Sequence, residues 1–210
     1  IEIIGKEGFP TPVAGAEELC INCGHCVSIC PHGALSLKTM SPNDCLPVRK
    51  ELLLTPEHCE HFLRSRRSIR SYKEKRAPRD LLQKLIETAR YAPTGHNSQS
   101  VHWLVIEDPT EVRRLGGLVA DWMRSLLAQS AEYALSMHMD WIVGLWDKGI
   151  DRILRGAPHL VVAHGLSTLP VSQSSCFIAL TYLELAAPSL GLGTCWAGYF
   201  TAAANFYPPL

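Results

Sequence analysis

Several features that mark common protein classes are missing from this 210-residue sequence. It has no run of about 18 consecutive apolar residues, so no membrane-spanning helix is expected. Its first residues lack a basic start followed by an apolar stretch, so no secretory signal peptide is expected. Its 20 basic and 20 acidic side chains balance to a net charge of zero, which argues against a general nucleic-acid binder.

The two ends of the chain also lack expected features. The sequence begins without Met at Ile1–Gly5, which has the pattern of the middle of a strand, and it stops at Tyr207–Leu210 without a closing element. We therefore expect the sequence to lack residues at both its N-terminus and its C-terminus. A hydrophobic fraction of 47% and a mean hydropathy of +0.04 suit a globular core, and the length allows one domain plus a smaller module.

Cysteine, by contrast, is abundant. Four of the eight cysteines lie within eleven residues, as Cys20-x2-Cys23-x2-Cys26-x3-Cys30. A disulfide framework suits a small secreted domain, which the missing signal peptide argues against. A zinc ribbon pairs two two-cysteine knuckles across a longer spacer, and this run is too compressed for that. Thiolates three residues apart on a tight loop suit successive irons of one cluster, so the spacing predicts a 4Fe–4S cluster.

The role of Cys30 stays open between two arrangements. In two-cluster bacterial ferredoxins the last cysteine of such a run ligates the other cluster. Residues 1–60 resemble the second half of such a ferredoxin, in which the first three cysteines hold one cluster and Cys30 serves another. The full-length protein would then hold two clusters. If the natural chain has a single cluster, Cys30, or else Cys45, completes it.

Composition and periodicity divide the chain into three segments. Residues 1–48 form the predicted ferredoxin-like 4Fe–4S module, with a short strand expected at Ala34–Leu37. Residues 49–63 predict a linking helix, because Thr55 and Pro56 provide a cap and a first-turn proline. Residues 64–210 form the predicted main domain, which we expect to lack its C-terminal part. Within it the apolar pattern predicts helices over Arg79–Tyr91 (capped by Asp80), Val112–Ala128 and Ser174–Leu190, and strands over His102–Glu107 and Leu160–Ala163.

A basic stretch opens the main domain, and in it Arg66, Ser68 and Arg70 alternate. On an extended backbone a period of two places the three side chains on one face. Guanidinium groups and a hydroxyl on one face suit a phosphate monoester. A nucleic-acid patch is the alternative, but Tyr72 is the one aromatic residue nearby that could stack on a base.

Two further segments stand out in the main domain and form a set with the basic stretch. Ala92–Gln99 is rich in donors and acceptors, and Gly191–Gly198 is rich in glycine. Together with Arg66–Tyr72, they resemble in order and spacing the FMN-binding segments of the nitroreductase family. The resemblance covers roughly residues 60–210, and the whole chain resembles the subgroup with an N-terminal ferredoxin module. Ser100 and His102-Trp103 depart from the family's usual Pro-Trp-His order.

The resemblance implies an α+β fold, a nitroreductase-like α/β sandwich with a mainly antiparallel sheet, and a homodimer with two FMN sites at its interface. The residues that it assigns to FMN fall in three groups. Arg66, Ser68 and Arg70, with Arg67, would hold the phosphate and ribityl chain; Pro93, Thr94, Asn97 and Gln99 would approach the flavin from the partner subunit; Trp196, Ala197 and Gly198 would place backbone groups at the isoalloxazine ring.

The implied activity is that of a flavin-dependent oxidoreductase. Electrons from NAD(P)H or a reduced ferredoxin would pass through the 4Fe–4S cluster and FMN to a small acceptor such as a nitroaromatic, quinone or enone. No catalytic side chain is expected, because FMN carries the redox chemistry. A Rossmann-type glycine fingerprint is absent, so a nicotinamide would dock transiently. The alternative is a non-catalytic electron-transfer flavo-iron–sulfur protein.

The remaining expectations concern macromolecular partners and cellular location. No nucleic-acid or membrane partner is expected. A cytoplasmic location is expected, because clusters and free thiols favour a reducing compartment.

Overall fold

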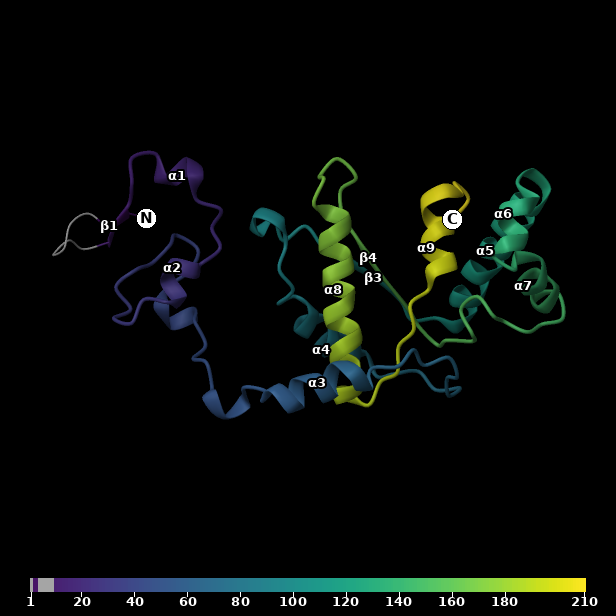
Figure 1. The fold of residues 1–210 in the computed structure, drawn as a ribbon, viewed down its shortest axis with the longest axis horizontal. Coiled ribbons are helices and arrows are strands. Elements are labelled where there is room, and N and C mark those ends of the chain that lie inside the picture. The colour runs from purple at the N-terminus through teal and green to yellow at the C-terminus, as the bar shows by residue number, and fades with distance from the viewer. Residues whose placement is uncertain (1, 4–9) are drawn as a thin grey trace. The chain divides into compact units, whose positions relative to one another are not determined.

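The computed structural model describes residues 2–3 and 10–210. The chain forms two units, of which the first comprises residues 1–59 together with 94–99 and the second residues 60–93 together with 100–210. The rest of the predicted strand at Ile1–Gly5 lies outside the described residues. Figure 1 shows the order of the elements along the chain, and each unit is taken by itself below.

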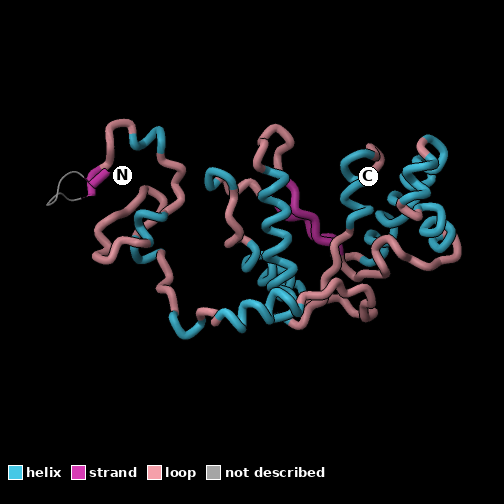
Figure 2. Tube along the Cα trace, viewed as in Figure 1, coloured by secondary structure: helices cyan, strands magenta, loops and turns pink. Residues whose placement is uncertain are grey.

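The first unit consists mostly of loops joined by very short elements (Figure 2). Strand β1 (Glu2–Ile3) pairs antiparallel with β2 (Pro10–Thr11). The other elements are α1 (Ala16–Leu19), α2 (His25–Ser28) and the 3-10 turns η1 (Pro42–Asp44), η2 (Lys50–Leu52) and η3 (Gly95–Asn97). Among residues 11–59 and 94–99, Val27 is the one buried hydrophobic side chain, at 2% exposed. Hydrophobic burial within these residues therefore contributes little to stability.

The strand predicted at Ala34–Leu37 is wrong. Leu37 forms a single bridge with Met40, and no strand runs through the segment. The backbone N–H of Ala34 instead donates a hydrogen bond to the thiol of Cys30, over 3.3 Å. Because that N–H group turns back toward the cysteine, it is not available to a neighbouring strand.

Of the segment 49–63 predicted to be a linking helix, residues 56–63 are helical, as part of α3 (Pro56–Ser65). It begins at the proline that the sequence indicates, and the hydroxyl of Thr55 accepts a hydrogen bond from the backbone N–H of His58 over 3.2 Å. This bond satisfies one of the N–H groups that the first turn of a helix leaves free.

The second unit is helix-rich with a small antiparallel sheet. Strand β3 (His102–Ile106) pairs with β4 (Leu160–His164), with His102 opposite His164 and Ile106 opposite Leu160. The α+β class with an antiparallel sheet is therefore confirmed. The helices are α4 (Arg79–Ala89), α5 (Pro109–Gln129), α6 (Ala131–Ser136), α7 (Met139–Trp146), α8 (Ser172–Ala186), the 3-10 turn η4 (Ala187–Leu190) and α9 (Gly198–Phe206).

Two hydrophobic clusters hold this unit together. In the larger cluster α5 packs against α6, α7 and α9, and Val119, Met123 and Met139 are almost fully buried; α5, α6 and α7 lie side by side in Figure 1. The smaller cluster joins Leu85 and Ala89 of α4 to Leu183 of α8 and Ala187 of η4. Helix α8 also packs against β4, so it connects the sheet to α4.

Two predicted helix ends are wrong. Helix α4 begins at Arg79 with Pro78 as its cap, so Asp80 lies inside the first turn, and no side chain caps this helix. The helix predicted over Ser174–Leu190 begins two residues earlier and leaves the α conformation after Ala186. Pro188 lies in the following 3-10 turn, and because proline has no N–H group it cannot continue the α-helical bonding.

Among residues 2–3 and 10–210, no helix combines the length and the apolar character that a membrane crossing requires.

Candidate functional site

A pocket of about 1100 Å³ lies in the second unit. Its walls come from segment 69–85, from β4 and the loop that follows it, from α8, and from segment 190–205. The walls therefore include parts of two of the three motif segments singled out in the sequence.

These two segments are joined directly. The backbone N–H of Ile69 donates to the carbonyl oxygen of Thr194 over 2.8 Å. A Cβ atom at Gly193 would lie 2.9 Å from the side chain of Ile69, closer than such atoms approach one another. Glycine at this position is therefore required for the close approach of the two segments.

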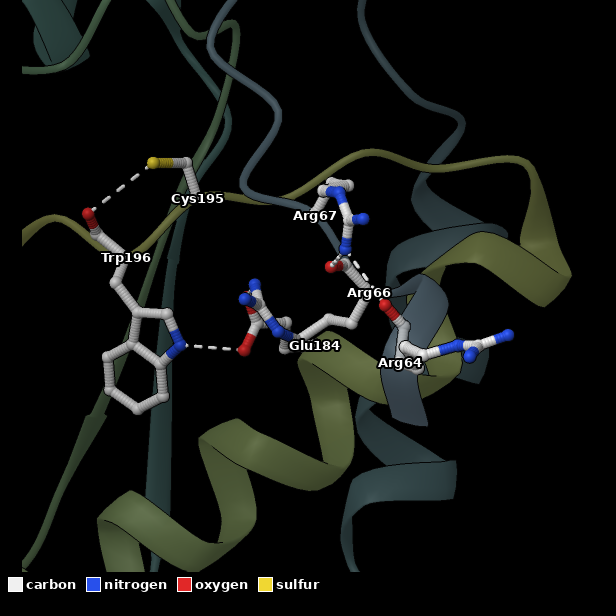
Figure 3. A network of polar contacts seen from close by, with 6 residues as sticks. All are labelled: Arg64, Arg66, Arg67, Glu184, Cys195 and Trp196. Atoms are coloured by element: carbon white, nitrogen blue, oxygen red, sulfur yellow. Dashed lines mark hydrogen bonds and ion pairs between the residues drawn. The ribbon is translucent and has the colours of Figure 1, made fainter. Parts of the chain in front are cut away.

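Glu184 of α8 connects the same two segments through its side chain (Figure 3). It is 8% exposed, and each carboxylate oxygen accepts a hydrogen bond. Oε1 accepts from Nη1 of Arg66 over 3.1 Å, and Oε2 accepts from the indole Nε1 of Trp196 over 2.8 Å. A buried carboxylate with both oxygens bonded fixes the positions of both partners.

The sequence analysis missed Glu184. It is the one charged residue in α8, whose other exposed and buried positions are apolar or neutral. Burying a single charge in such a helix costs desolvation energy unless the charge is paired. A lone glutamate in an apolar helix was therefore the sequence feature that could have indicated a buried ion pair.

The predicted phosphate-binding residues lie in a connector without regular secondary structure. Arg66 binds Glu184, and Arg67 folds back on the main chain, with Nη1 donating to the carbonyl oxygens of Arg64 and Arg66 over 2.8 Å each. Ser68 is half-buried and Arg70 is exposed, and neither side chain has a hydrogen bond among the described residues. None of these side chains lines the pocket.

The predicted ring-binding residues lie at the pocket itself. Trp196 and Ala197 are among its walls, and Gly198 is the first residue of α9. The ring of Trp196 faces that of Phe177, with centroids 6.0 Å apart and planes tilted by 34°. Both rings are more than two fifths exposed. They therefore provide an accessible aromatic surface in the wall of the pocket.

Three titratable groups in the pocket wall have shifted pKa values. Burial raises the pKa of Tyr72, to which the neighbouring Cys195 thiol adds, while Arg155 and Arg70 oppose the shift. Burial also raises the pKa of the Cys176 thiol. Burial lowers the pKa of His159, whose Nε2 accepts a hydrogen bond from the backbone N–H of Ala77 over 2.8 Å. Near neutral pH the tyrosine and the cysteine keep their protons and the histidine is neutral.

The third motif segment divides between the units. Pro93 belongs to the second unit, whereas Thr94–Gln99 belongs to the first. The hydroxyl of Thr94 accepts a hydrogen bond from the backbone N–H of Gln99 over 3.0 Å. The amide of Asn97 donates to backbone carbonyl groups of Ile21 and Asn22, which lie between the first two motif cysteines.

All four motif cysteines are free thiols. Cys20 and Cys23 are exposed, and Cys26 and Cys30 are partly exposed. The pKa of Cys30 is lowered, chiefly by the hydrogen bond from the backbone N–H of Ala34 and then by that of His32. A lowered pKa favours the thiolate, which is the form that ligates iron.

The same thiols are not gathered around one point. In the described part of the chain, no three His, Cys, Asp or Glu side chains are close enough to hold a single ion. What the structure supports is the chemistry of Cys30, where backbone N–H groups favour the thiolate that a cluster iron requires.

Comparison with known proteins agrees with both parts of the chain. Residues 63–207 match the nitroreductase family, and residues 16–36 match the 4Fe-4S binding domain. The chain belongs to the nitroreductase family.

Individual relatives of this nitroreductase-family chain are distant. An iodotyrosine deiodinase from Thermotoga neapolitana is 27% identical over 134 residues, which cover 62% of this chain and 68% of that protein. A putative NADH dehydrogenase/NAD(P)H nitroreductase from Methanothermobacter thermautotrophicus is 24% identical over 144 residues, covering 66% of this chain and 59% of that protein. This chain therefore spans about three fifths to two thirds of the length of these relatives.

The fold also matches a solved nitroreductase. The crystal structure of a nitroreductase with bound FMN from Bacteroides fragilis superposes with a TM-score of 0.55, at 23% identity, over 71% of this chain and 74% of that one. At this identity the likeness shows the fold. The chain is thus a nitroreductase-family oxidoreductase that also carries a 4Fe–4S binding domain.

Proposed function

We propose that this nitroreductase-family chain binds FMN and passes electrons from a reduced donor, through its 4Fe–4S cluster and FMN, to a small acceptor. The observation that carries the proposal is the joining of segments 66–72 and 191–198 at the pocket. Ile69 and Thr194 connect them through the backbone, and Glu184 connects them through Arg66 and Trp196. A pocket of about 1100 Å³ is large enough for a flavin with an acceptor beside it.

FMN, when bound, supplies a redox centre that exchanges one or two electrons, so no catalytic side chain is required. We assign its phosphate and ribityl chain to Arg66, Ser68 and Arg70 with Arg67, and its ring to Trp196, Ala197 and Gly198. Ser68 and Arg70 support this assignment, because neither side chain makes a hydrogen bond with the described residues. Pro93, Thr94, Asn97 and Gln99 remain predicted contacts from a partner subunit.

The acceptor is proposed to be a flat organic molecule, such as a nitroaromatic, a quinone or an enone. The aromatic surface of Phe177 and Trp196 supports this, because planar molecules stack on exposed rings. Tyr72 keeps its proton and offers a hydroxyl donor at the same pocket. The relative named iodotyrosine deiodinase also supports an aromatic acceptor. The relative named for NAD(P)H supports a nicotinamide donor, with a reduced ferredoxin as the other candidate.

The cluster is assigned to Cys20, Cys23 and Cys26; Cys30 completes it if the protein holds one cluster and ligates the other if it holds two. A homodimer is proposed from α8, where Phe177, Ile178 and Tyr182 are 45%, 39% and 41% exposed. Apolar side chains exposed together on one helix are typical of a surface that a partner covers.

The test of the flavin assignment compares FMN with riboflavin, which lacks the phosphate. Losing a charge-assisted hydrogen bond to phosphate costs about 1.5–3 kcal/mol, so Arg66→Ala should weaken FMN about ten- to a hundredfold and riboflavin far less. Lys84→Ala is the control, because Lys84 is exposed on α4 and does not line the pocket. Equal binding of both flavins by Arg66→Ala and the parent would remove Arg66 from the site. Full flavin and iron without turnover of any acceptor would favour a non-catalytic electron carrier.

A further inference from the structure

The loop Thr94–Gln99 belongs to the first unit, although the chain on both sides of it belongs to the second. Within the first unit, the side chain of Asn97 bonds to the loop that carries the first motif cysteines. Its Nδ2 donates to the carbonyl oxygen of Asn22 over 2.9 Å and to that of Ile21 over 3.3 Å. These two carbonyl groups lie between Cys20 and Cys23. The amide of Asn97 therefore holds the backbone of the cysteine loop.

The cysteine loop is held from a second direction at the same residue. The hydroxyl of Thr39 donates to Oδ1 of Asn22 over 2.7 Å. Asn22 and Asn97 both adopt left-handed backbone conformations, with φ of 52° and 51°. Asparagine tolerates this conformation better than most residues, so both backbones fit the geometry in which these bonds form.

We propose that Asn97 is a positioning residue of the iron–sulfur site. By bonding to Ile21 and Asn22 it fixes the separation of Cys20 and Cys23, which stabilises the bound cluster. The inference rests on the proposed cluster.

The experiment compares three variants of the anaerobically purified protein with its cluster and FMN bound. Asn97→Asp keeps the acceptor oxygen and the shape but removes both donors. Asn97→Gly removes the side chain at a backbone conformation that glycine adopts freely. His96→Asp is the matched control, because His96 has a φ of 52°, is exposed, and makes no side-chain hydrogen bond with the described residues. The readouts are the rate of iron release to a chelator, the FMN dissociation constant, and backbone amide exchange at residues 20–24.

Both Asn97 variants should release iron about tenfold faster than the parent, which corresponds to about 1.4 kcal/mol. Amide exchange at residues 20–24 should rise in both Asn97 variants, and His96→Asp should match the parent. Iron release at the parent rate in both Asn97 variants would overturn the inference. A parent that binds iron but no FMN would refute the proposed flavin function and leave the iron readout valid.

Discussion

The pair formed by Glu184 and Arg66 should respond unequally to the loss of either partner. Glu184 is nearly buried, with its side chain 10% exposed, whereas the side chain of Arg66 is 40% exposed. Removing Arg66 leaves a buried carboxylate whose one remaining side-chain partner among the described residues is the Trp196 indole. Removing Glu184 leaves a guanidinium and an indole N–H that both reach water, because Trp196 is 41% exposed. We therefore expect the Arg66 change to be the more destabilising one.

The expected change in the free energy of unfolding for each variant follows from how deeply the affected side chains are buried. Breaking a buried ion pair by removing one partner costs about 3–5 kcal/mol when both charges are buried. Because Arg66 is partly exposed, we reduce this to about 2 kcal/mol for Arg66→Met, which keeps the length of the side chain. Glu184→Leu removes the buried charge and places an apolar side chain beside Leu183, so the free energy of unfolding should change by less than about 1 kcal/mol. The double variant should resemble Glu184→Leu.

Urea unfolding followed by far-ultraviolet circular dichroism measures these differences in the parent, both single variants and the double variant. This signal is preferable to fluorescence, because the environment of Trp196 changes in the variants. The coupling energy from the double-mutant cycle should be about 1–2 kcal/mol. If Glu184→Leu destabilises the protein as much as Arg66→Met, burial does not decide the asymmetry and the reasoning is refuted.

Three further predictions test other parts of the molecule. Cys23→Ser should lose most iron and the broad cluster absorption, since a hydroxyl is a poor iron ligand. Cys59→Ser, which changes an exposed cysteine of α3, should keep both. Unchanged iron content in Cys23→Ser would contradict the cluster assignment. Because the pKa of His159 is lowered in the fold, its contribution to stability is present above about pH 6.5 and declines as the pH falls below that value. His159→Gln keeps an acceptor for the backbone N–H of Ala77, so it should flatten the fall in melting temperature between about pH 7.5 and 5.5. An unchanged pH profile would exclude His159 as the source of that fall. Light scattering on the protein should give twice its monomer mass, and Ile178→Glu should halve it, whereas a stable monomer that retains FMN would contradict the proposed dimer.

Much of the fold is predictable from local patterns. Helix α5 and the strands β3 and β4 lie within a few residues of the segments that apolar periodicity indicates. The errors are local too. The Ala34–Leu37 segment has the composition of a strand, but its first N–H group bonds to a thiol, which no propensity describes. Asp80 has a suitable side chain for a cap, yet the helix begins one residue before it.

The contacts within the candidate site were harder to predict from local sequence patterns. The joining of segments 66–72 and 191–198 was implied by the family resemblance, but the contact between Ile69 and Gly193 depends on tertiary structure. The carboxylate of Glu184 is separated from Arg66 by 118 positions in the sequence, so no spacing rule connects them. For the same reason the bond from Asn97 to Asn22 was missed, although both residues belong to segments that had been singled out.

The scarcity of hydrophobic burial in the first unit gives the cluster a structural role as well as a redox role. With Val27 as the one buried hydrophobic side chain among residues 11–59 and 94–99, these residues gain too little from burial to offset the conformational entropy of folding. Small domains in this situation depend on metal groups, whose binding free energy becomes folding free energy. The hydrogen bonds at Asn22 and Asn97 order the backbone near two of the ligands before a cluster binds, which lowers the entropy that binding must overcome. Removal of iron should therefore unfold the first unit and leave the second, with its two hydrophobic clusters, intact.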